Sequence, residues 1–437
     1  MRIAVIGTGI SGLGAAHLLR SRAEIVLYDG AARAGGHANT VDVGQDGRQV
    51  PVDTGFIVCN EATYPNFLRL LAGLGVATEP TDMSFSFSAA GGRFEYAGDT
   101  LGGLFAQRRN AFRPAHYGML RDILRFYREA PAHLDAGSAD LTLGDLLAGG
   151  GYGSGFVHDH LLPMGAAIWS CPTAEMLRFP ARSFIRFFAN HGLLSVRDRP
   201  VWRSVPGGSR RYVDALTAPF AGSLRLGTPV ASLHRTPIGV VVRDAAGQED
   251  RFDQVVVATH ADQALALLAE ATPLEREVLG AFRFQANDAV LHDDPALMPR
   301  RKRAWASWNY LSEDRRGGGV SVTYWMNRLQ PLPGLRPVFV SLNPFRAPRP
   351  GSVLARIRYD HPVFDHRALA AQASIGTIQG RGGIWFCGAW CGYGFHEDGL
   401  AAGIAVAEAL GARRPWAVED MSPAAQHCRP LRPAEAA

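Results

Sequence analysis

The chain begins with a pattern of apolar and polar positions that predicts a strand, a helix and a second strand. Residues 2–6 form a short, mostly apolar run, residues 7–12 contain three glycines, and residues 13–20 are rich in alanine and leucine. A second apolar run at 24–28 completes a unit of about 30 residues. Units of this kind build parallel, doubly wound sheets, so we expect an α/β protein with a Rossmann-like domain.

The middle of the chain has a different pattern. Between about residues 64 and 199 it consists of helical segments and loops that are rich in glycine, proline, phenylalanine and arginine. Dense apolar alternation returns between 224 and 258, and strand-like runs broken by prolines follow between 304 and 342. We therefore expect the chain to cross between two domains more than once. The expected division is a doubly wound cofactor-binding domain (1–63, 205–275 and 351–412), a mixed α+β substrate domain (64–204 and 276–350) and a poorly ordered tail (413–437).

The glycine turn has the spacing of a dinucleotide-binding motif. Gly7 permits the tight turn, Gly9 lets the backbone approach a pyrophosphate, and Gly12 allows the helix to pack closely on the strand. The helix that starts at Ile10 and Ser11 presents unpaired N–H groups and a positive dipole end to phosphates. This part of the chain therefore predicts a binding site for the diphosphate of a dinucleotide.

Asp29 completes this prediction, because it stands 22 residues after Gly7, at the end of the second apolar run. A carboxylate at that place accepts hydrogen bonds from the hydroxyl groups of an adenosine ribose. The motif by itself leaves open whether the dinucleotide is NAD or FAD.

Composition and charge narrow the class of protein. The formal net charge is only +5, and Lys302 is the only lysine among 45 basic residues. Such a small positive charge, carried almost wholly by arginine, does not indicate a nucleic-acid partner. Five cysteines without a C-x-x-C pair predict neither a disulfide framework nor a metal site. We expect a cytoplasmic protein without a signal peptide or a transmembrane helix. Peripheral contact with the inner face of the membrane stays open.

The residues after the second strand resemble a known cofactor fingerprint. Residues 29–37, Thr40 and residues 52–56 (VDTGF) resemble the extended FAD fingerprint of the flavin amine oxidase superfamily, which includes monoamine and polyamine oxidases, protoporphyrinogen oxidase and phytoene-type desaturases. The resemblance implies FAD as the cofactor. It also implies six cofactor-binding residues here: Gly30, Arg33, Gly36, His37, Gly55 and Phe56. The superfamily usually has an arginine in place of His37.

Two later blocks extend the resemblance along the chain. Residues 228–233 and 252–259 resemble the strands on the adenine side, where the backbone of Val230 would meet the adenine. Residues 385–390 and 394–403 resemble the second FAD motif, in which a helix N-terminus lies beside the pyrimidine end of the isoalloxazine and stabilises negative charge on it. This motif implies four further cofactor contacts: Gly388, Asp398, Gly399 and Leu400.

The second FAD motif also supplies the candidates for catalysis. It would place His396 and Glu397 next to the flavin, where either could act as the base that accompanies hydride transfer. His396 could instead cap the following helix. Amine oxidases commonly hold a lysine near the flavin, but Lys302 lies in the run RRKR and is typical of a solvated loop.

The substrate is implied by a finer resemblance. Residues 285–292 and 299–310 resemble a bacterial subgroup of FAD-dependent oxidoreductases associated with lipid modification of the cyclopropane-fatty-acid-synthase type. This implies desaturation of an apolar substrate, a fatty acyl chain of a methylated phospholipid, and a methyltransferase as a partner. The aromatic middle of the chain would form either an ordinary core or an apolar tunnel with basic residues at its mouth: Arg121, Arg125, Arg128, Arg178, Arg182 or Arg186.

Two other functions stay open from the sequence. One is an amine oxidase that forms an imine, with an aromatic cage drawn from Trp305, Trp308, Tyr310, Trp325 and Trp390. The other is a non-catalytic FAD-binding protein that delivers lipid to another enzyme.

Overall fold

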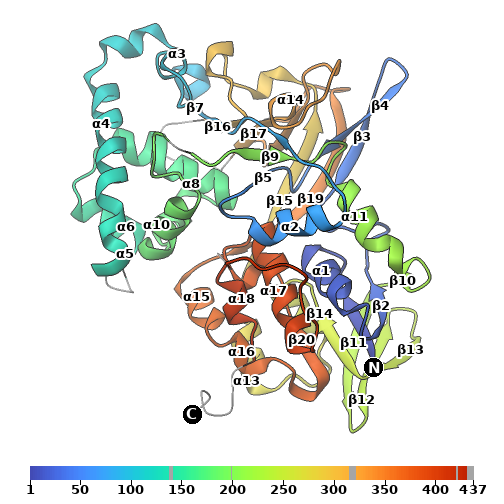
Figure 1. Ribbon diagram of the computed structural model, residues 1–437. Coiled ribbons are helices and arrows are strands. Elements are labelled where there is room, and N and C mark those ends of the chain that lie inside the picture. Colours follow the sequence, from blue (N-terminus) through green and yellow to red (C-terminus); the bar gives the residue numbers. More distant parts are fainter. Residues whose placement is uncertain (137–140, 198, 314–320, 420–421, 431–437) are drawn as a thin grey trace.

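The computed structural model describes residues 1–136, 141–197, 199–313, 321–419 and 422–430 (Figure 1). Its lower half in this view is built on a five-stranded parallel sheet with the order β10-β2-β1-β14-β20. These strands are β1 (Arg2–Ile6), β2 (Glu24–Tyr28), β10 (Leu224–Arg225), β14 (Gln254–Val257) and β20 (Ile384–Phe386). The expected α/β fold class is confirmed.

Two helices rich in small residues pack tightly together on this sheet. They are α1 (Ile10–Leu19) and α17 (His396–Ala409). A Cβ atom on Gly403 would lie 2.2 Å from the carbonyl oxygen of Ser11, which is far inside van der Waals contact. Glycine in α17 is therefore required for the close approach that places the N-termini of both helices at the same edge of the sheet.

An antiparallel ribbon flanks the parallel sheet. It consists of β11 (Val230–Thr236), β12 (Gly239–Asp244) and β13 (Glu249–Phe252). β11 begins with Val230, next to the turn that follows β2, because Thr228 donates its backbone N–H to the carbonyl of Asp29 at 2.8 Å. The ribbon thus brings the expected adenine strand beside the expected ribose contact.

The upper half contains a seven-stranded sheet with the order β19-β15-β18-β17-β16-β7-β8. Its strands are β7 (Phe85–Ala89), β8 (Phe94–Ala97), β15 (Arg283–His292), β16 (Trp308–Ser312), β17 (Ser321–Trp325), β18 (Phe339–Leu342) and β19 (Val353–Val363). β19 pairs with β15 along almost its whole length. Residues 353–363 therefore belong to this sheet, which corrects their assignment to the cofactor-binding domain.

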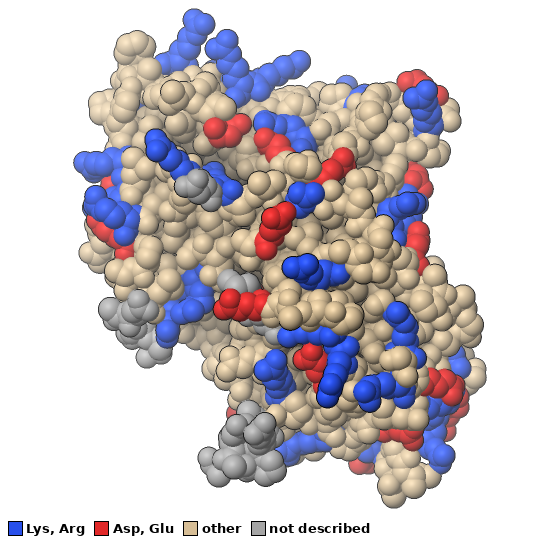
Figure 2. All heavy atoms as spheres, viewed as in Figure 1, with Lys and Arg blue, Asp and Glu red and all other residues tan. Residues whose placement is uncertain are grey.

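Helices cover one side of the upper sheet, on the left in Figure 1. The main ones are α4 (Pro114–Glu129), α8 (Leu162–Trp169) and α10 (Ala181–Asn190). Aromatic side chains of this region form a second hydrophobic core, which includes Phe126 of α4, Phe184 and Phe188 of α10, and Phe156 between α4 and α8 in the sequence. In the space-filling view, lysine and arginine side chains project from the upper edge of this half (Figure 2).

The C-terminal segment packs against α17, which corrects the expectation of a poorly ordered tail for its described part. Trp416 Nε1 and Arg414 Nη1 donate to Oδ1 of Asn66 at 3.0 and 2.8 Å. The short helix α18 (Ala424–His427) follows, and Cys428 is fully buried. The tail is held by specific polar contacts, which composition alone does not reveal.

Two further properties concern the described residues as a whole. All five cysteines are buried and none forms a disulfide. No helix in the described ranges combines the length and the hydropathy needed to cross a bilayer.

Candidate active site

One cavity of about 880 Å³ extends between the two halves of the molecule. Its volume lies in the upper part of the range of small-molecule and cofactor sites. Its walls come from the turns after β1 and β2, from the start of α17 and from the helices and sheet of the upper half. The cavity therefore joins the expected cofactor site to the expected substrate site.

The glycine turn forms one end of this cavity. Gly7, Gly9, Ile10 and Ser11 all line it. A Cβ atom on Gly9 would meet no atom within 4 Å, so the backbone here borders open space. The first turn of α1 has no side-chain cap, which leaves its N-terminus directed at this space. The arrangement fits the diphosphate of a dinucleotide.

Asp29 organises the neighbouring wall. Its Oδ2 accepts hydrogen bonds from the backbone N–H of Thr8 at 2.8 Å and from Thr8 Oγ1 at 2.5 Å, and its Oδ1 accepts from the N–H of Ala31 at 2.9 Å. Asp29, Gly30 and Val230 line the cavity together. The structure thus brings the three residues expected on the adenosine side to one wall, with the Asp29 carboxylate also holding the glycine turn to β2.

His37 supplies an unpartnered polar atom to the cavity. The residue is half-buried, but its Nε2 is itself buried and has no hydrogen-bond partner among the described residues. Its ring stacks on Tyr359 with centroids 4.9 Å apart, and burial holds its pKa well below the usual value. A neutral imidazole at this position can form a hydrogen bond with a ligand. It could therefore replace the arginine that the flavin amine oxidase superfamily usually has here.

Three other expected cofactor residues line the central part of the cavity. They are Gly36, Gly55 and Phe56, and Gly388 lies across from them in the loop after β20. Gly36 has a φ of +58°, which favours glycine. A Cβ on Gly55 would lie 2.2 Å from the carbonyl oxygen of His37, so glycine here allows the two loops to touch.

Some of the residues expected to bind the cofactor do not line the cavity, and this corrects their direct role. The Arg33 guanidinium donates to the carbonyls of Gly36 at 2.7 Å and Ala38 at 3.3 Å, so it shapes the loop that carries His37. Gly12 serves packing, since a Cβ there would lie 2.0 Å from the carbonyl oxygen of Gly7. Gly399 and Leu400 likewise pack α17 onto α1.

His396 reaches the cavity as a fixed, neutral ring. It stacks on Phe56 with centroids 3.8 Å apart and an interplanar angle of 10°. Its Nε2 lies 2.8 Å from the hydroxyl of Tyr212. Burial lowers the pKa of His396 to about 3, so the ring is a weak base at neutral pH. These contacts favour a positioning role over that of a general base.

Glu397 points away from the cavity, which corrects its expected role as a base. Its carboxylate accepts hydrogen bonds from the backbone N–H groups of Asn66 at 2.9 Å and Phe67 at 3.0 Å, and from Asn66 Nδ2 at 3.0 Å. These groups belong to the first turn of α2 (Pro65–Gly73). Burial raises the pKa of Glu397 to about 7. The side chain therefore joins α17 to α2.

Asp398 also acts within the fold. Its Oδ2 accepts a hydrogen bond from the backbone N–H of Phe395 at 2.9 Å, and its Oδ1 accepts one from Ser422 Oγ at 2.5 Å. Burial raises its pKa to about 6. Asp398 thus fixes the start of α17 and the C-terminal segment, and it does not line the cavity.

The other end of the cavity is formed by side chains of the upper half. They are mostly apolar and include Met83, Phe85, Tyr127, Met164, Ile168 and Leu193. Arg199 is the arginine found among the described cavity-lining residues, in place of those expected at 121–128 and 178–186. Its Nε donates to the carbonyl of Ser195 at 2.8 Å, and the side chain is exposed. No spacing in the sequence marks these residues as a group.

The expected aromatic cage forms only in part. Trp308 and Trp390 line the cavity, together with Tyr324, which makes an edge contact with Trp308 at 5.0 Å. Trp305 and Trp325 instead pack on each other at 5.3 Å, outside the cavity. Tyr310 stacks on Phe87 in the core, and Lys302 is exposed on a 3-10 turn away from the cavity.

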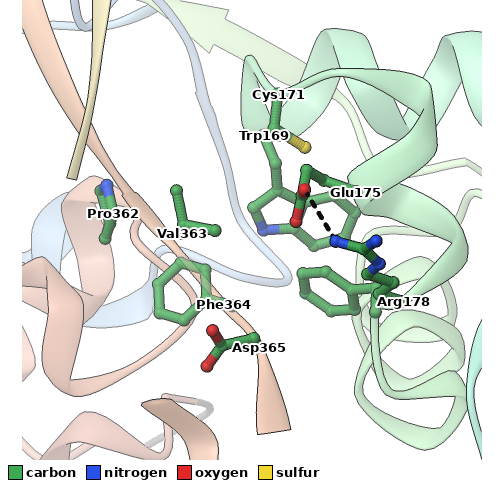
Figure 3. A pocket seen from close by; sticks show the side chains of 9 residues that line it. Trp169, Cys171, Glu175, Arg178, Pro362, Val363, Phe364 and Asp365 are labelled. Carbon is green, nitrogen blue, oxygen red and sulfur yellow. Dashed lines mark hydrogen bonds and ion pairs between the residues drawn. The ribbon is translucent and has the colours of Figure 1, made fainter. Parts of the chain in front are cut away.

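A small crevice lies on the other side of Trp169 from the main cavity. Its walls include Cys171, Phe364 and the ion pair between Glu175 and Arg178 at 3.3 Å (Figure 3). Its volume is about 20 Å³, room for roughly one water molecule. This crevice is too small for a substrate, so the large cavity is the candidate active site.

Comparisons with known proteins agree with this geometry. Residues 10–286 match the family model described as flavin containing amine oxidoreductase. A putrescine oxidase with bound putrescine superposes with a TM-score of 0.67 at 14% identity, covering 94% of this chain and 99% of that one. Cyclohexylamine oxidase from Brevibacterium oxydans gives 0.66 at 15% identity, with the same coverage of both chains.

A third solved structure is a CLA-producing fatty acid isomerase from P. acnes. It superposes with a TM-score of 0.63 at 14% identity, and the match covers 92% of this chain and 96% of that one. At these identities the solved structures establish the fold. No curated protein sequence matches the chain significantly.

Proposed function

The chain belongs to the family of flavin-containing amine oxidoreductases and uses FAD, and on this premise we propose that it dehydrogenates an apolar acyl chain. The observation that carries the proposal is the apolar end of the cavity, with Arg199 beside it. A fatty acyl chain would lie among Met83, Met164 and Leu193, and its anionic group would pair with Arg199.

The charges of the cavity favour this substrate over an amine. Among the described residues that line the cavity, the acidic ones are Asp29 and Asp360. Asp29 belongs to the adenosine wall, and Asp360 lies on β19 beside His361, which is close to His37. Among the described residues of the wall around Arg199, none carries a carboxylate that could bind an ammonium group. One relative in fold is a fatty acid isomerase, which acts on an acyl chain.

In the proposed reaction the substrate loses two hydrogen atoms, one as a hydride and one as a proton, and a carbon–carbon double bond forms. Bound FAD would accept both hydrogens, so the reaction balances without a base from the protein. Gly9 and the N-terminus of α1 would hold its diphosphate, and His37 would bond it through Nε2. His396, held by Tyr212 and Phe56, would fix the wall near the reacting carbon, and the surrounding aromatic rings exclude water.

We also propose the setting of this reaction. A methyltransferase that modifies acyl chains would supply the substrate, so the enzyme would work at the cytoplasmic face of the membrane. The proposed partner rests on the resemblance to the lipid-modifying subgroup and calls for a direct binding measurement between the two proteins.

The test is anaerobic reduction of the flavin in the purified holoenzyme. We expect bacterial phospholipid or free fatty acid to bleach the flavin absorbance, and putrescine and cyclohexylamine to leave it unchanged. Bleaching by amines alone would establish an amine oxidase and end the acyl proposal. A flavin that no acyl chain or amine reduces would point to the non-catalytic lipid carrier.

A further inference from the structure

The upper half exposes large apolar side chains that no part of the fold covers. Phe112 is 87% exposed and Leu101 is 77% exposed, the highest values for large apolar residues in the described ranges. They belong to neighbouring short helices, α3 (Leu101–Leu104) and the 3-10 turn η2 (Arg108–Phe112). Tyr117 fixes the end of η2 by donating its hydroxyl to the carbonyl of Ala111 at 3.0 Å. Isolated exposed apolar residues are ordinary, but two held on one prominent edge indicate contact with an apolar phase.

The same edge is strongly basic. Residues 90–121 and 299–303 contain nine basic and two acidic side chains, an excess of seven. The whole chain has a net charge of only +5, so the rest of the molecule is slightly acidic. Basic side chains project from this upper edge in the space-filling view (Figure 2). The charge is therefore concentrated in one place.

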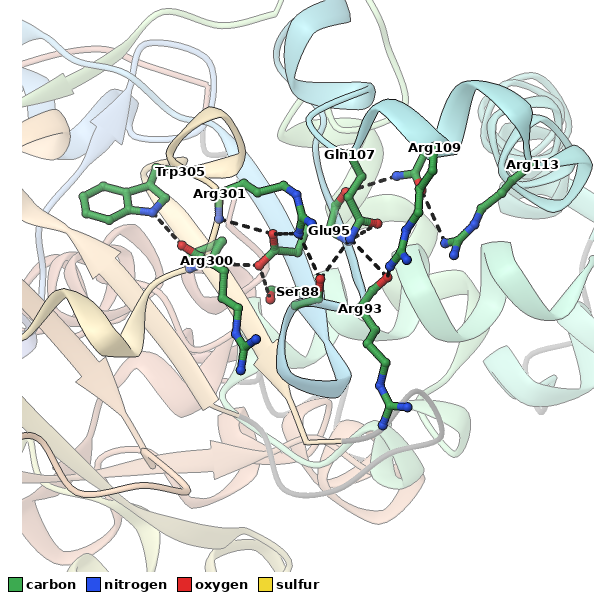
Figure 4. Close-up of polar contacts among 12 residues, drawn as sticks. Ser88, Arg93, Glu95, Gln107, Arg109, Arg113, Arg300, Arg301 and Trp305 are labelled. Atoms are coloured by element: carbon green, nitrogen blue, oxygen red, sulfur yellow. Dashed lines mark hydrogen bonds and ion pairs between the residues drawn. The ribbon is translucent and has the colours of Figure 1, made fainter.

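Both acidic side chains are already paired, Glu95 with Arg301 and Asp99 with Arg328. Glu95 is fully buried, and its carboxylate accepts hydrogen bonds from the backbone N–H of Arg300 at 2.7 Å and from Arg301 Nη1 at 2.8 Å (Figure 4). Asp99 lies 3.7 Å from Arg328. Glu95 thus ties the turn at 300–303 to β8 while the remaining arginines face outward.

These features define a basic–apolar surface. Its members are Arg93, Leu101, Arg108, Arg109, Phe112, Arg300, Lys302 and Arg303, all exposed. We propose that this surface binds an anionic phospholipid bilayer, with Phe112 and Leu101 inserted at the acyl boundary and the basic side chains on lipid phosphates. A nucleic acid would use the charges but would give no reason for two protruding apolar side chains.

The surface is connected to the cavity by one helix. α4 begins beside η2 and carries Tyr127 into the cavity wall near its other end. Docking of this surface would therefore hold the cavity close to a bilayer. The inference does not depend on which substrate is oxidised, because it concerns only the outer face of the upper half.

The test is sedimentation of the FAD-loaded full-length protein with vesicles of phosphatidylcholine, alone or mixed with phosphatidylglycerol. We expect binding to the mixed vesicles that weakens as salt increases. Each basic residue near an anionic surface contributes roughly fivefold, so Arg108→Ser/Arg109→Ser should lower the partition coefficient by about 25-fold. Leu101→Ser/Phe112→Ser should weaken binding at high salt as well as low salt.

The matched control is Ile238→Ser, in the turn between β11 and β12 of the other half, where the side chain is 65% exposed. We expect this variant to bind as the wild type does. Flavin retention in each variant verifies folding. The proposal is overturned if wild-type protein ignores the mixed vesicles, if the control loses as much as Leu101→Ser/Phe112→Ser, or if duplex DNA displaces the vesicles and the apolar substitutions change nothing. Vesicle binding without acyl turnover would leave this surface established and the proposed reaction wrong.

Discussion

The two ends of the cavity differ in what lines them: mainly backbone at the cofactor end and mainly side chains at the substrate end. The cofactor end is made of backbone: Gly7, Gly9 and the N-terminus of α1 form its wall, and Asp29 holds them in place. The substrate end is made of side chains from β7, α4, α8 and the loop that carries Arg199. A site formed by backbone depends on a few glycines at fixed spacing. A site formed by side chains can be altered by substitutions while the fold stays the same.

This difference explains why relatives with different substrates share the fold. A putrescine oxidase, a cyclohexylamine oxidase and a fatty acid isomerase all superpose over more than nine-tenths of the chain. The superpositions include both halves of the molecule, so the fold alone does not set the substrate, and the side chains that line the cavity are left to do so. Changes at the two ends should therefore have separable effects.

The largest effect is expected at the cofactor end, from Gly9→Val. A Cβ atom at Gly9 meets no protein atom within 4 Å, so the variant should fold, but its side chain would enter the space of the diphosphate. We expect FAD binding to weaken roughly 100-fold or more. The ratio of flavin to protein absorbance after purification checks this.

The control for this change is Gly73→Val at the end of α2, where a Cβ also meets no atom within 4 Å and which lines neither of the two cavities described above. It should purify with full flavin. A yellow Gly9→Val protein with wild-type affinity would show that the cofactor does not bind at the backbone end.

A smaller effect, confined to the substrate end, is expected from Arg199→Ala. Loss of a charge-assisted hydrogen bond should raise KM for a fatty acid roughly 10- to 100-fold. Flavin content should stay unchanged, because Arg199 is in the upper half of the cavity. Steady-state kinetics compares a fatty acid with its neutral methyl ester, so it separates binding of the carboxylate from binding of the acyl chain. An equal rise in KM for both substrates would contradict a role of Arg199 in binding the anionic group.

Glu397→Gln tests the contact between α17 and α2, two helices of one hydrophobic core, and changes stability more than activity. Because burial raises the pKa of Glu397 from 4.5 to about 7, its ionisation costs free energy in the folded state. Its contribution to stability is complete below pH 4.5 and falls as the pH rises through 7. The stability advantage of wild type over the variant should thus be larger at pH 5 than at pH 8, by on the order of 2 kcal/mol.

Urea unfolding of both proteins across this pH range measures that difference. Glu277→Gln, at an exposed position, serves as the control for the loss of one surface carboxylate and should change the stability little. A Glu397→Gln variant whose stability tracks wild type at every pH would show that the carboxyl does not titrate in the folded protein.

The smallest effect concerns the pH dependence of His396. With a pKa of about 3, the ring stays neutral from pH 5 to 8, so its ionisation should not shape the rate of flavin reduction there. We expect His396→Gln to lower the rate modestly without changing the form of the pH profile. Loss in the variant of an ionisation near pH 6 to 7 would restore His396 as the general base.

The same contrast explains what could be predicted from the sequence. Gly7 and Gly9 could be predicted because a diphosphate imposes their spacing on the backbone, and Asp29 because a ribose needs an acceptor at the end of the second strand. The α/β fold followed from the strand and helix around them. Glu397 was misjudged because its place in the motif says nothing about which way the side chain points. In the structure it faces the N–H groups of α2, a contact 330 residues away in sequence.

Arg199 was missed for a related reason. It lies in a loop without periodicity, and it lines the cavity together with Tyr127 of α4 and Met164 of α8, which are distant from it in the sequence. The described part of the tail was misjudged because composition suggested disorder, while its order comes from single polar contacts such as Ser422 on Asp398. The place of Arg199 and the order of the C-terminal segment both depend on contacts between residues far apart in the sequence. No local sequence pattern predicts such contacts.

The central claim is that the apolar end of the cavity holds an acyl chain for dehydrogenation, and the most direct measurement is mass spectrometry of the lipid after one anaerobic turnover. The account predicts one acyl product lacking two hydrogen atoms for each flavin reduced, and far less of it from Arg199→Ala at low substrate. Full reduction of the flavin with no change in the mass of any acyl chain would contradict it.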